Sequence, residues 1–267
     1  MRLQSRFLAS VAVTAVLVIG LGGCQTMSDI TGSISSKPSP SAAETDPRRA
    51  VEVTSERYRA DPKNVEAALA YAQALRVSGQ RSQAVAMLEQ ATIAHPGDRS
   101  LLAAYGRALV DNGNFQQALD VLTRAHSPDN PDWRILSVQG TALDQLGRHD
   151  DARRYYESAL KIVPGEPSVL SNLGLSYMLS KNLPKAEEVL RQAYASGGAD
   201  ARVRQNLALV IGLQGRFAEA EQIVRADLPP DEATANVAYL KQMLNRKDDP
   251  RASASGKTPL ASLSRPE

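Results

Sequence analysis

The chain has 267 residues and a formal charge of +2, with few aromatic residues and an apolar fraction that rests largely on alanine. Alanine has the highest intrinsic helix propensity, so this composition favours close-packed helices over sheets. Arg2 and Arg6 account for the whole charge excess, which argues against a nucleic-acid partner because such proteins carry a clustered basic surface.

Residues 1–23 have the pattern of a secretory signal peptide. Two arginines precede a short apolar stretch at 7–19, which is too short to span a bilayer comfortably. Gly22 and Gly23 then lead into Cys24, and this run resembles the bacterial lipobox, in which a signal peptidase cuts before the cysteine and the new terminus is acylated. We therefore expect a mature chain that begins at a lipidated Cys24, with an uncleaved signal anchor as the alternative.

Cys24 is the only cysteine, so the mature chain holds no internal disulfide. Each buried methylene contributes about 0.8 kcal/mol, and several acyl chains on one residue would hold the protein firmly in a membrane. Gln25 follows, where an aspartate would resemble the inner-membrane retention signal. The resemblance therefore implies an outer-membrane lipoprotein that faces the periplasm.

The segments that flank the central domain differ in composition. Residues 24–46 are rich in serine, proline and glycine, which predicts a flexible tether. Residues 47–64 are predicted to form an N-terminal capping helix, because Ala50 lies one repeat length before an alanine that recurs in the domain. The polar residues 246–267 are predicted to be a disordered tail.

Residues 65–245 are predicted to form a repeat domain with a period of 34 residues. Position 1 of the five copies falls at Val65, Arg99, Trp133, Pro167 and Ala201. Position 20 is alanine in every copy: Ala84, Ala118, Ala152, Ala186 and Ala220. Position 8 is always small, and position 15 is glycine in every copy except the fourth, which has Lys181. This is the tetratricopeptide-repeat pattern of helix–turn–helix units, so we expect an all-α solenoid of about five repeats.

Each repeated position has a physical reason. Small residues at positions 8 and 20 are expected where the two antiparallel helices of a repeat cross and their backbones approach. Glycine at position 15 takes the left-handed conformation that follows a helix. Large apolar residues at positions 7, 11 and 24 are expected to fill the space between repeats.

The fifth copy departs from the pattern, as a terminal repeat should. Arg204 stands at position 4 and Asp227 at position 27, where the other copies have apolar residues. Pro229 and Pro230 then interrupt the chain. Asp231 is predicted to cap one further helix, which would close the end of the stack.

The sequence predicts no enzyme. The three histidines have no metal-ligand spacing, and no nucleotide-binding loop or nucleophile elbow is present. Adjacent acids, such as Asp150 and Asp151, are predicted to be solvated. We therefore expect no catalytic residues, no metal, no cofactor and no small-molecule substrate.

A repeat stack of this kind offers a concave surface lined by its first helices, where positions 2, 5, 6 and 9 face a ligand in similar proteins. Asparagine recurs at position 6 in Asn172 and Asn206, and such an amide matches the donor and acceptor of a peptide bond. The predicted peptide-binding groove consists of Asn172, Asn206, Arg202, Gln205, Arg134 and Arg107, with a segment of mixed or slightly acidic character as its ligand. The alternative is that asparagine is simply common at this position.

The whole arrangement resembles the TadD pilus-assembly lipoproteins of the tight-adherence (Flp) system. The likeness rests on the lipobox and tether, on the first repeat at Ala67–Ala91, and on the run Ala235–Leu244. It implies a pilotin-like role, in which the lipoprotein helps an outer-membrane secretin subunit to assemble. A lipoprotein adaptor that regulates cell-wall enzymes would have the same fold and remains an alternative, and an enzyme of unknown type is a further one.

Overall fold

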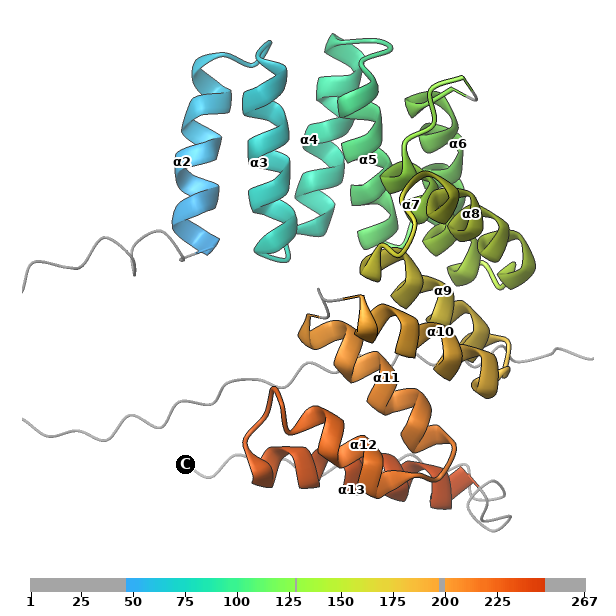
Figure 1. The fold of residues 1–267 in the computed structure, drawn as a ribbon. Helices are drawn as coiled ribbons and strands as arrows, with labels where there is room; N and C mark the ends of the chain where they lie inside the picture. Colours follow the sequence, from blue (N-terminus) through green and yellow to red (C-terminus); the bar gives the residue numbers. More distant parts are fainter. Residues whose placement is uncertain (1–46, 128, 197–199, 248–267) are drawn as a thin grey trace, which may run out of the picture. The chain divides into compact units, whose positions relative to one another are not determined.

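The computed structural model describes residues 47–127, 129–196 and 200–247, and every element in them is helical. Helices α2 to α13 follow one another along the chain (Figure 1), with these bounds: Pro47–Ala60, Val65–Val77, Arg81–Ala94, Arg99–Asp111, Phe115–Ala125, Trp133–Gln145, His149–Ile162, Pro167–Leu179, Leu183–Ala195, Ala201–Leu213, Phe217–Val224 and Pro230–Lys247. The signal peptide, Cys24, the tether and residues 248–267 of the tail lie outside the described residues.

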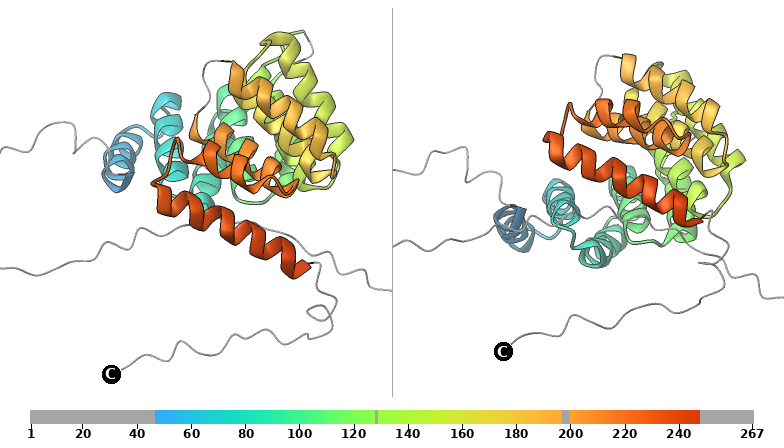
Figure 2. Two further views of the ribbon diagram at one scale, coloured as in Figure 1. Left: turned by 60° about the horizontal axis from the view of Figure 1, so that its bottom comes forward. Right: turned by 90° about the horizontal axis from the view of Figure 1, so that it is seen from below.

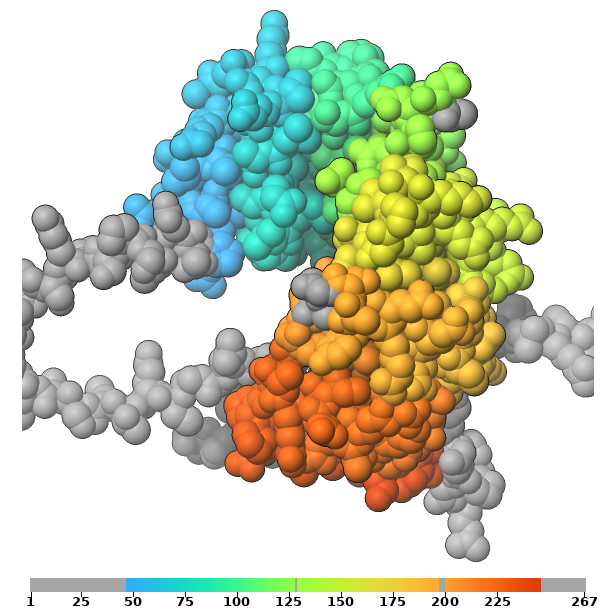
Figure 3. Space-filling model, in the orientation of Figure 1, coloured from blue at the N-terminus to red at the C-terminus, as the bar shows by residue number. Residues whose placement is uncertain are grey.

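The helices confirm the predicted all-α solenoid and its register. The first helices α3, α5, α7, α9 and α11 begin at position 1 of the five copies. Each packs against the second helix of its own copy; α3 also packs against α2, and the later first helices pack against the helix pair before them. Figure 3 shows neighbouring helices in close side-chain contact along this series. Helix α2 begins and ends one repeat period before α4 does. It therefore corresponds to the second helix of an incomplete copy that precedes the first complete one.

A polar side chain caps the start of every first helix. The residue before position 1 accepts a hydrogen bond from a backbone N–H of the first turn, and its five occupants are Asn64, Asp98, Asp132, Glu166 and Asp200. These bonds satisfy donors that have no partner within the helix. In Asp200 the hydrogen bond from the Val203 amide holds the pKa of the carboxyl below its usual value.

Position 15 has the predicted left-handed backbone in all five copies. Gly79, Gly113, Gly147 and Gly215 have φ between 76° and 88°. Lys181 occupies the same position with φ 64°, and it is the one residue other than glycine with a positive φ in the described residues. The conformation is therefore imposed by the turn between the two helices, even where the side chain disfavours it.

The small residue at position 8 has a different role from the predicted one. A Cβ added to Gly140 would lie 2.6 Å from Cε1 of Tyr156, and one added to Gly174 would lie 2.6 Å from Cγ of Leu190. Both neighbours stand at position 24, so the missing side chain makes room for a large residue of the second helix. The position-20 alanines are at most 1% exposed, in the core between the helices.

The last two helices differ from the other pairs. Helix α12 has 8 residues, and α13 begins at Pro230 rather than after a cap at Asp231. Proline suits the first turn of a helix, because its fixed φ is helical and its missing N–H would have no partner there. Ala233 of α13 is buried against α11 and α12, while Val237 and Leu240 are half-buried, with Leu240 against Gly212 of α11. No helix in the described part of the chain is long and apolar enough to cross a membrane.

Candidate functional site

The first helices meet one another along the stack. Contacts join α3 to α5, α5 to α7, α7 to α9 and α9 to α11, whereas within the described residues no second helix contacts another second helix. Side chains on the shared side of the first helices therefore form one surface across the repeats. We call positions 2, 5, 6 and 9 of α3, α5, α7, α9 and α11 the first-helix face.

The two predicted asparagines occupy equivalent places on this face. Nδ2 of Asn172 donates to Oγ of Ser137 at 3.1 Å, and Nδ2 of Asn206 donates to Oγ of Ser171 at 2.9 Å. Each bond joins position 6 of one first helix to position 5 of the helix before it. We call the two bonds the Ser–Asn ladder.

The ladder uses only part of the hydrogen-bonding capacity of each asparagine amide. A primary amide has two N–H donors and an oxygen with two lone pairs, and each ladder bond uses one donor. Asn172 and Asn206 are half-buried, while Ser137 and Ser171 are 7% and 4% exposed. The buried serines therefore fix the amides, and the asparagines retain an acceptor and a donor toward solvent.

The arginines of the first-helix face have different partners. Arg202 is exposed and its guanidinium lies 3.3 Å from the Asp200 carboxylate. The guanidinium of Arg134 lies 4.5 Å from the centroid of the Trp133 ring, a cation–π contact. Gln205 is exposed on α11 beside Arg202. Of the three predicted residues of α11, Arg202 and Gln205 are thus exposed, whereas Asn206 is half-buried.

Arg107 of α5 is the half-buried cation of this face. Among the described residues it forms no salt bridge and donates no hydrogen bond, although Arg76 nearby is bound to Asp111 at 2.6 Å. Burial lowers the pKa of Arg107, and the positive charge of Arg76 lowers it further. A guanidinium in this setting gains from an anion that approaches along the face.

A polar network joins three consecutive helices: an aspartate of α7, a histidine of α8 and a serine of α9. Oδ1 of Asp144 accepts from Nδ1 of His149 at 2.8 Å and from Oγ of Ser176 at 2.7 Å, and Oδ2 accepts from the Tyr156 hydroxyl at 3.0 Å. A catalytic triad would need the serine to bond the histidine ring. Here both bond the carboxylate, and Ser176 is 0% exposed. The network links two repeats and offers no nucleophile.

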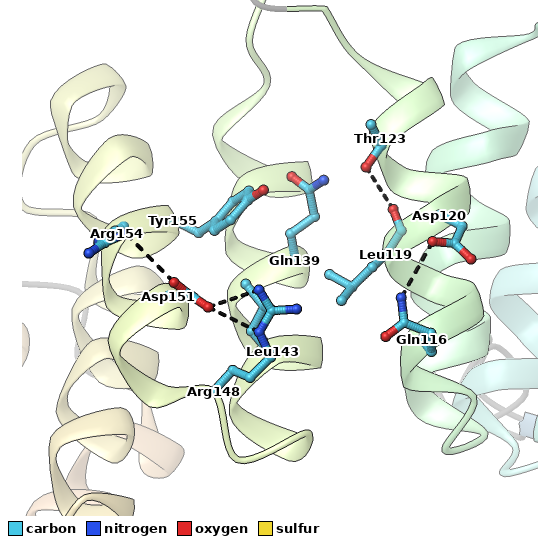
Figure 4. Close-up of a pocket in the computed structure, with 10 residues that line it drawn as sticks. All are labelled: Gln116, Leu119, Asp120, Thr123, Gln139, Leu143, Arg148, Asp151, Arg154 and Tyr155. Carbon is cyan, nitrogen blue, oxygen red and sulfur yellow. Dashed lines mark hydrogen bonds and ion pairs between the residues drawn. The ribbon is translucent and has the colours of Figure 1, made fainter.

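A groove of about 390 Å³ opens between α6 and α8, on the side of α7 away from the first-helix face (Figure 4). Three of its four charged side chains are paired with one another, since Asp151 accepts from Arg148 at 2.8 Å and lies 3.7 Å from Arg154. No group of three His, Cys, Asp or Glu residues suited to a metal occurs in the described parts of the chain.

Comparisons with known proteins agree with this architecture. Family models of the tetratricopeptide repeat match residues 137–201 and 201–226, and a model described as anaphase-promoting complex, cyclosome, subunit 3 matches residues 49–125. No curated protein sequence matches the chain at a significant level.

Solved structures share the fold at low sequence identity. PilW, a type IV pilus biogenesis factor, has a TM-score of 0.63 and 20% identity, over 73% of this chain and 92% of its own. A tetratricopeptide repeat protein of Parabacteroides merdae has a TM-score of 0.62 and 12% identity, over 76% and 78%. The Cut9–Hcn1 structure has a TM-score of 0.61 and 15% identity, over 79% of this chain and 46% of the other, so this chain spans about half of that relative.

The repeat register, the helix pairs and the family models lead to the same assignment. Tetratricopeptide repeats are non-catalytic scaffolds that bind protein partners, and the first-helix face is the shared surface on which this stack presents polar side chains. The chain folds as an all-α tetratricopeptide-repeat solenoid of about six helix pairs.

Proposed function

We propose that the first-helix face binds an extended segment of a partner protein, and that the protein is an outer-membrane lipoprotein with a pilotin-like role in tight-adherence pilus assembly. The observation that carries the binding proposal is the Ser–Asn ladder. It presents two amides of the same orientation on consecutive first helices.

The spacing of the ladder suits an extended backbone. Neighbouring packed helices lie roughly 8–10 Å apart, and an extended chain advances about 3.3 Å per residue. Asn172 and Asn206 would therefore meet peptide groups about three residues apart. The side chains between them would be free to face the half-buried Leu175 and Leu209 of the same two helices.

Charge adds a preference to this backbone contact. Arg107, which has no salt bridge in the described residues, would receive an acidic side chain or a terminal carboxylate of the segment. Arg134 and Arg202 are exposed on the same face and would extend the preference for acidic residues.

The pilus assignment rests on the sequence. The lipobox at Cys24, the tether and the run Ala235–Leu244 resemble TadD lipoproteins, and the lipid would place the first-helix face at the membrane where a secretin assembles. PilW, a type IV pilus biogenesis factor, shares the fold with this chain.

The decisive experiment measures secretin multimers in outer-membrane fractions. We expect fewer multimers in a strain that lacks the protein, and a similar loss with Asn172→Ala combined with Asn206→Ala. The matched control replaces two exposed glutamines on second helices, Gln83→Ala with Gln192→Ala, and should assemble multimers normally.

A second pair of substitutions separates binding from structure. Ser137→Ala with Ser171→Ala removes the ladder bonds and keeps both asparagines, so secretin assembly should fall less than with the asparagine variant. Equal losses in two folded variants would make the ladder a purely structural feature. Normal assembly in the deletion strain would refute the pilotin role and favour the adaptor of cell-wall enzymes.

A further inference from the structure

Gln139 of α7 occupies a position at which the other four copies have a large apolar residue. Position 7 is, in chain order, Tyr71, Tyr105, Gln139, Leu173 and Leu207. Three of the apolar residues are fully buried in the core, and Gln139 is as deeply buried, at 2% exposure. A buried amide costs free energy unless its polar atoms are hydrogen-bonded. The partners of this amide therefore bear on why a glutamine stands here.

One end of the Gln139 amide has a partner, and the other end has none among the described residues. Oε1 lies 3.2 Å from Nε2 of His126, which follows α6. Nε2 of Gln139 donates no hydrogen bond to a described residue, and it is not sealed from solvent. Figure 4 shows the amide between Tyr155 of α8 and Leu119 of α6, in the groove described above. The buried side chain therefore presents an unused polar end to this groove.

The groove offers an apolar surface and a charge beside this amide. Leu143 is buried in its lining, and Leu119 and Tyr155 are half-buried there. Asp120 is exposed on the α6 wall and is the one charged side chain of the lining that forms no salt bridge with a described residue. Its carboxylate accepts a long hydrogen bond, 3.5 Å, from Gln116. The volume of about 390 Å³ lies within the range of ligand pockets, which combine apolar walls with a few fixed polar groups.

We propose that this groove is a second protein-binding site, which takes a segment of a partner protein with an apolar side chain next to a basic one. The apolar side chain packs on Leu119 and Tyr155, and a main-chain peptide group of the segment bonds to Gln139. A peptide group has both an acceptor and a donor, so it matches the free end of the amide whichever way the amide is turned. The basic side chain pairs with Asp120.

The two walls of the groove determine on which side the basic residue lies. On the α8 wall Arg148 and Arg154 share the carboxylate of Asp151, so that wall repels a cation. The α6 wall carries the unpaired Asp120 and attracts one. This preference is opposite to the acidic preference proposed for the first-helix face. The groove lies on the other side of α7, in the middle of the helix series, which Figure 2 shows in green and yellow-green. The two surfaces therefore select different segments.

A displayed library of random linear peptides tests the chemistry of the occupant. The full chain, purified in mild detergent, is the target of the selection. We expect one class of enriched peptides to carry a lysine or arginine next to a large apolar residue. Synthetic peptides of this class are then titrated with the protein by fluorescence anisotropy. Their affinity should be the same for wild type and for Asn172→Ala with Asn206→Ala, because the first-helix face does not hold them.

Variants of the lining assign these peptides to the groove. Asp120→Lys should weaken their binding about ten-fold or more, because it places a cation beside the basic residue. Gln139→Met keeps the length of the side chain and removes its amide, and should weaken binding roughly five-fold. Thr123→Trp adds a bulky side chain at an exposed position of the α6 wall and should block the groove. The matched control is Glu157→Lys, which reverses an exposed acid of α8 outside the lining and should leave the affinity unchanged.

Two results would overturn the proposal. One is a selection that enriches no basic and apolar peptides. The other is a set of such peptides whose affinity is unchanged by Asp120→Lys and Thr123→Trp, in variants that are folded by circular dichroism. Both of these substitutions are at exposed positions, so the test stands even where Gln139→Met disturbs the core. Neither result would affect the binding proposed for the first-helix face, which the secretin multimers test.

Discussion

Arg204 and Asp227 form an ion pair with each other, and each stands where every other repeat has an apolar residue. Nε of Arg204 donates to Oδ2 of Asp227 at 2.7 Å, and a second bond joins the same two side chains. Asp227 is 10% exposed and Arg204 is 23% exposed at the side chain. Two departures that look independent in the sequence are therefore one contact between α11 and the turn that follows α12.

The first prediction follows from this pair. Asp227→Ala leaves the Arg204 guanidinium without its carboxylate partner, so the free energy of unfolding should fall. Arg204→Leu combined with Asp227→Ala restores the residues of the second, third and fourth repeats, and should be close to neutral or stabilising. Urea titrations of the three proteins measure this, and a double variant less stable than Asp227→Ala would contradict it.

The second prediction concerns the strained turn at Lys181. A left-handed conformation costs an ordinary residue about 1–2 kcal/mol, and glycine pays about 0.5–1 kcal/mol of extra entropy. Lys181→Gly should therefore raise the stability by roughly 0.5–1 kcal/mol. Gly147→Lys, the reverse change in the preceding repeat, should lower it by a similar amount in the same thermal melts. Two shifts of the same sign would contradict the prediction.

The third prediction concerns the close approach at Gly140. Gly140→Ala would place a methyl group 2.6 Å from the ring of Tyr156, whose hydroxyl is held by Asp144. The ring cannot move without loss of that bond, so we expect a cost of about 1–3 kcal/mol. Gly174→Ala faces the more flexible Leu190 and should cost less. A larger loss in Gly174→Ala would show that the tyrosine is not fixed.

The fourth prediction concerns pH. The carboxylate of Glu187 accepts hydrogen bonds from three side chains: Gln214 at 2.8 Å, Arg191 at 2.8 Å and Arg216 at 2.7 Å. Burial acts to raise the pKa of Glu187, but these hydrogen bonds outweigh it and the pKa is lowered. A lowered pKa in the folded state stabilises the protein above the unfolded pKa, and that contribution is lost as the pH falls.

Wild type should therefore be more stable than Glu187→Gln at pH 7, and the difference should shrink below about pH 4.3, where the unfolded chain takes up the proton first. Urea unfolding of both proteins at pH 7 and pH 3 measures the difference. A difference that is unchanged at pH 3 would mean that the charge of Glu187 does not contribute.

The fifth prediction concerns the lipid. Because the lipobox ends at Cys24, metabolic labelling with a palmitate analogue should mark wild type and not Cys24→Ala. The labelled protein should fractionate with outer membranes. Equal labelling of both proteins would refute lipidation at this residue.

The repeat register could be predicted from the sequence because two places in each repeat restrict the residue type. The turn between the helices favours glycine, and the close contact between the two helices requires a small residue. Glycine at position 15 predicts the turns between helices, and the first helices begin at the residues that the 34-residue period predicts. The capping residue before position 1 follows the same period, so the five polar residues in register are a further sequence signal for the helix starts.

Contacts between repeats were harder to predict. Asn172 and Asn206 were identified as groove residues, but their bonds to Ser137 and Ser171 depend on how two consecutive helices pack. A search for polar residues spaced by 35, one more than the period, would have found them. That Arg107 has no salt bridge to any described residue could not be predicted, since it depends on which neighbouring acid another arginine has already bound.

The Ser–Asn ladder also has a mechanical consequence. The bond between Asn206 and Ser171 spans the junction between α9 and α11, so the distance between the two asparagines changes whenever that junction flexes. A bound segment that contacts both amides fixes the distance between the two repeats. The elastic work needed to bring the repeats to that distance therefore becomes part of the binding free energy of the segment. Substitutions that stiffen or loosen this junction would then alter affinity without touching the ligand.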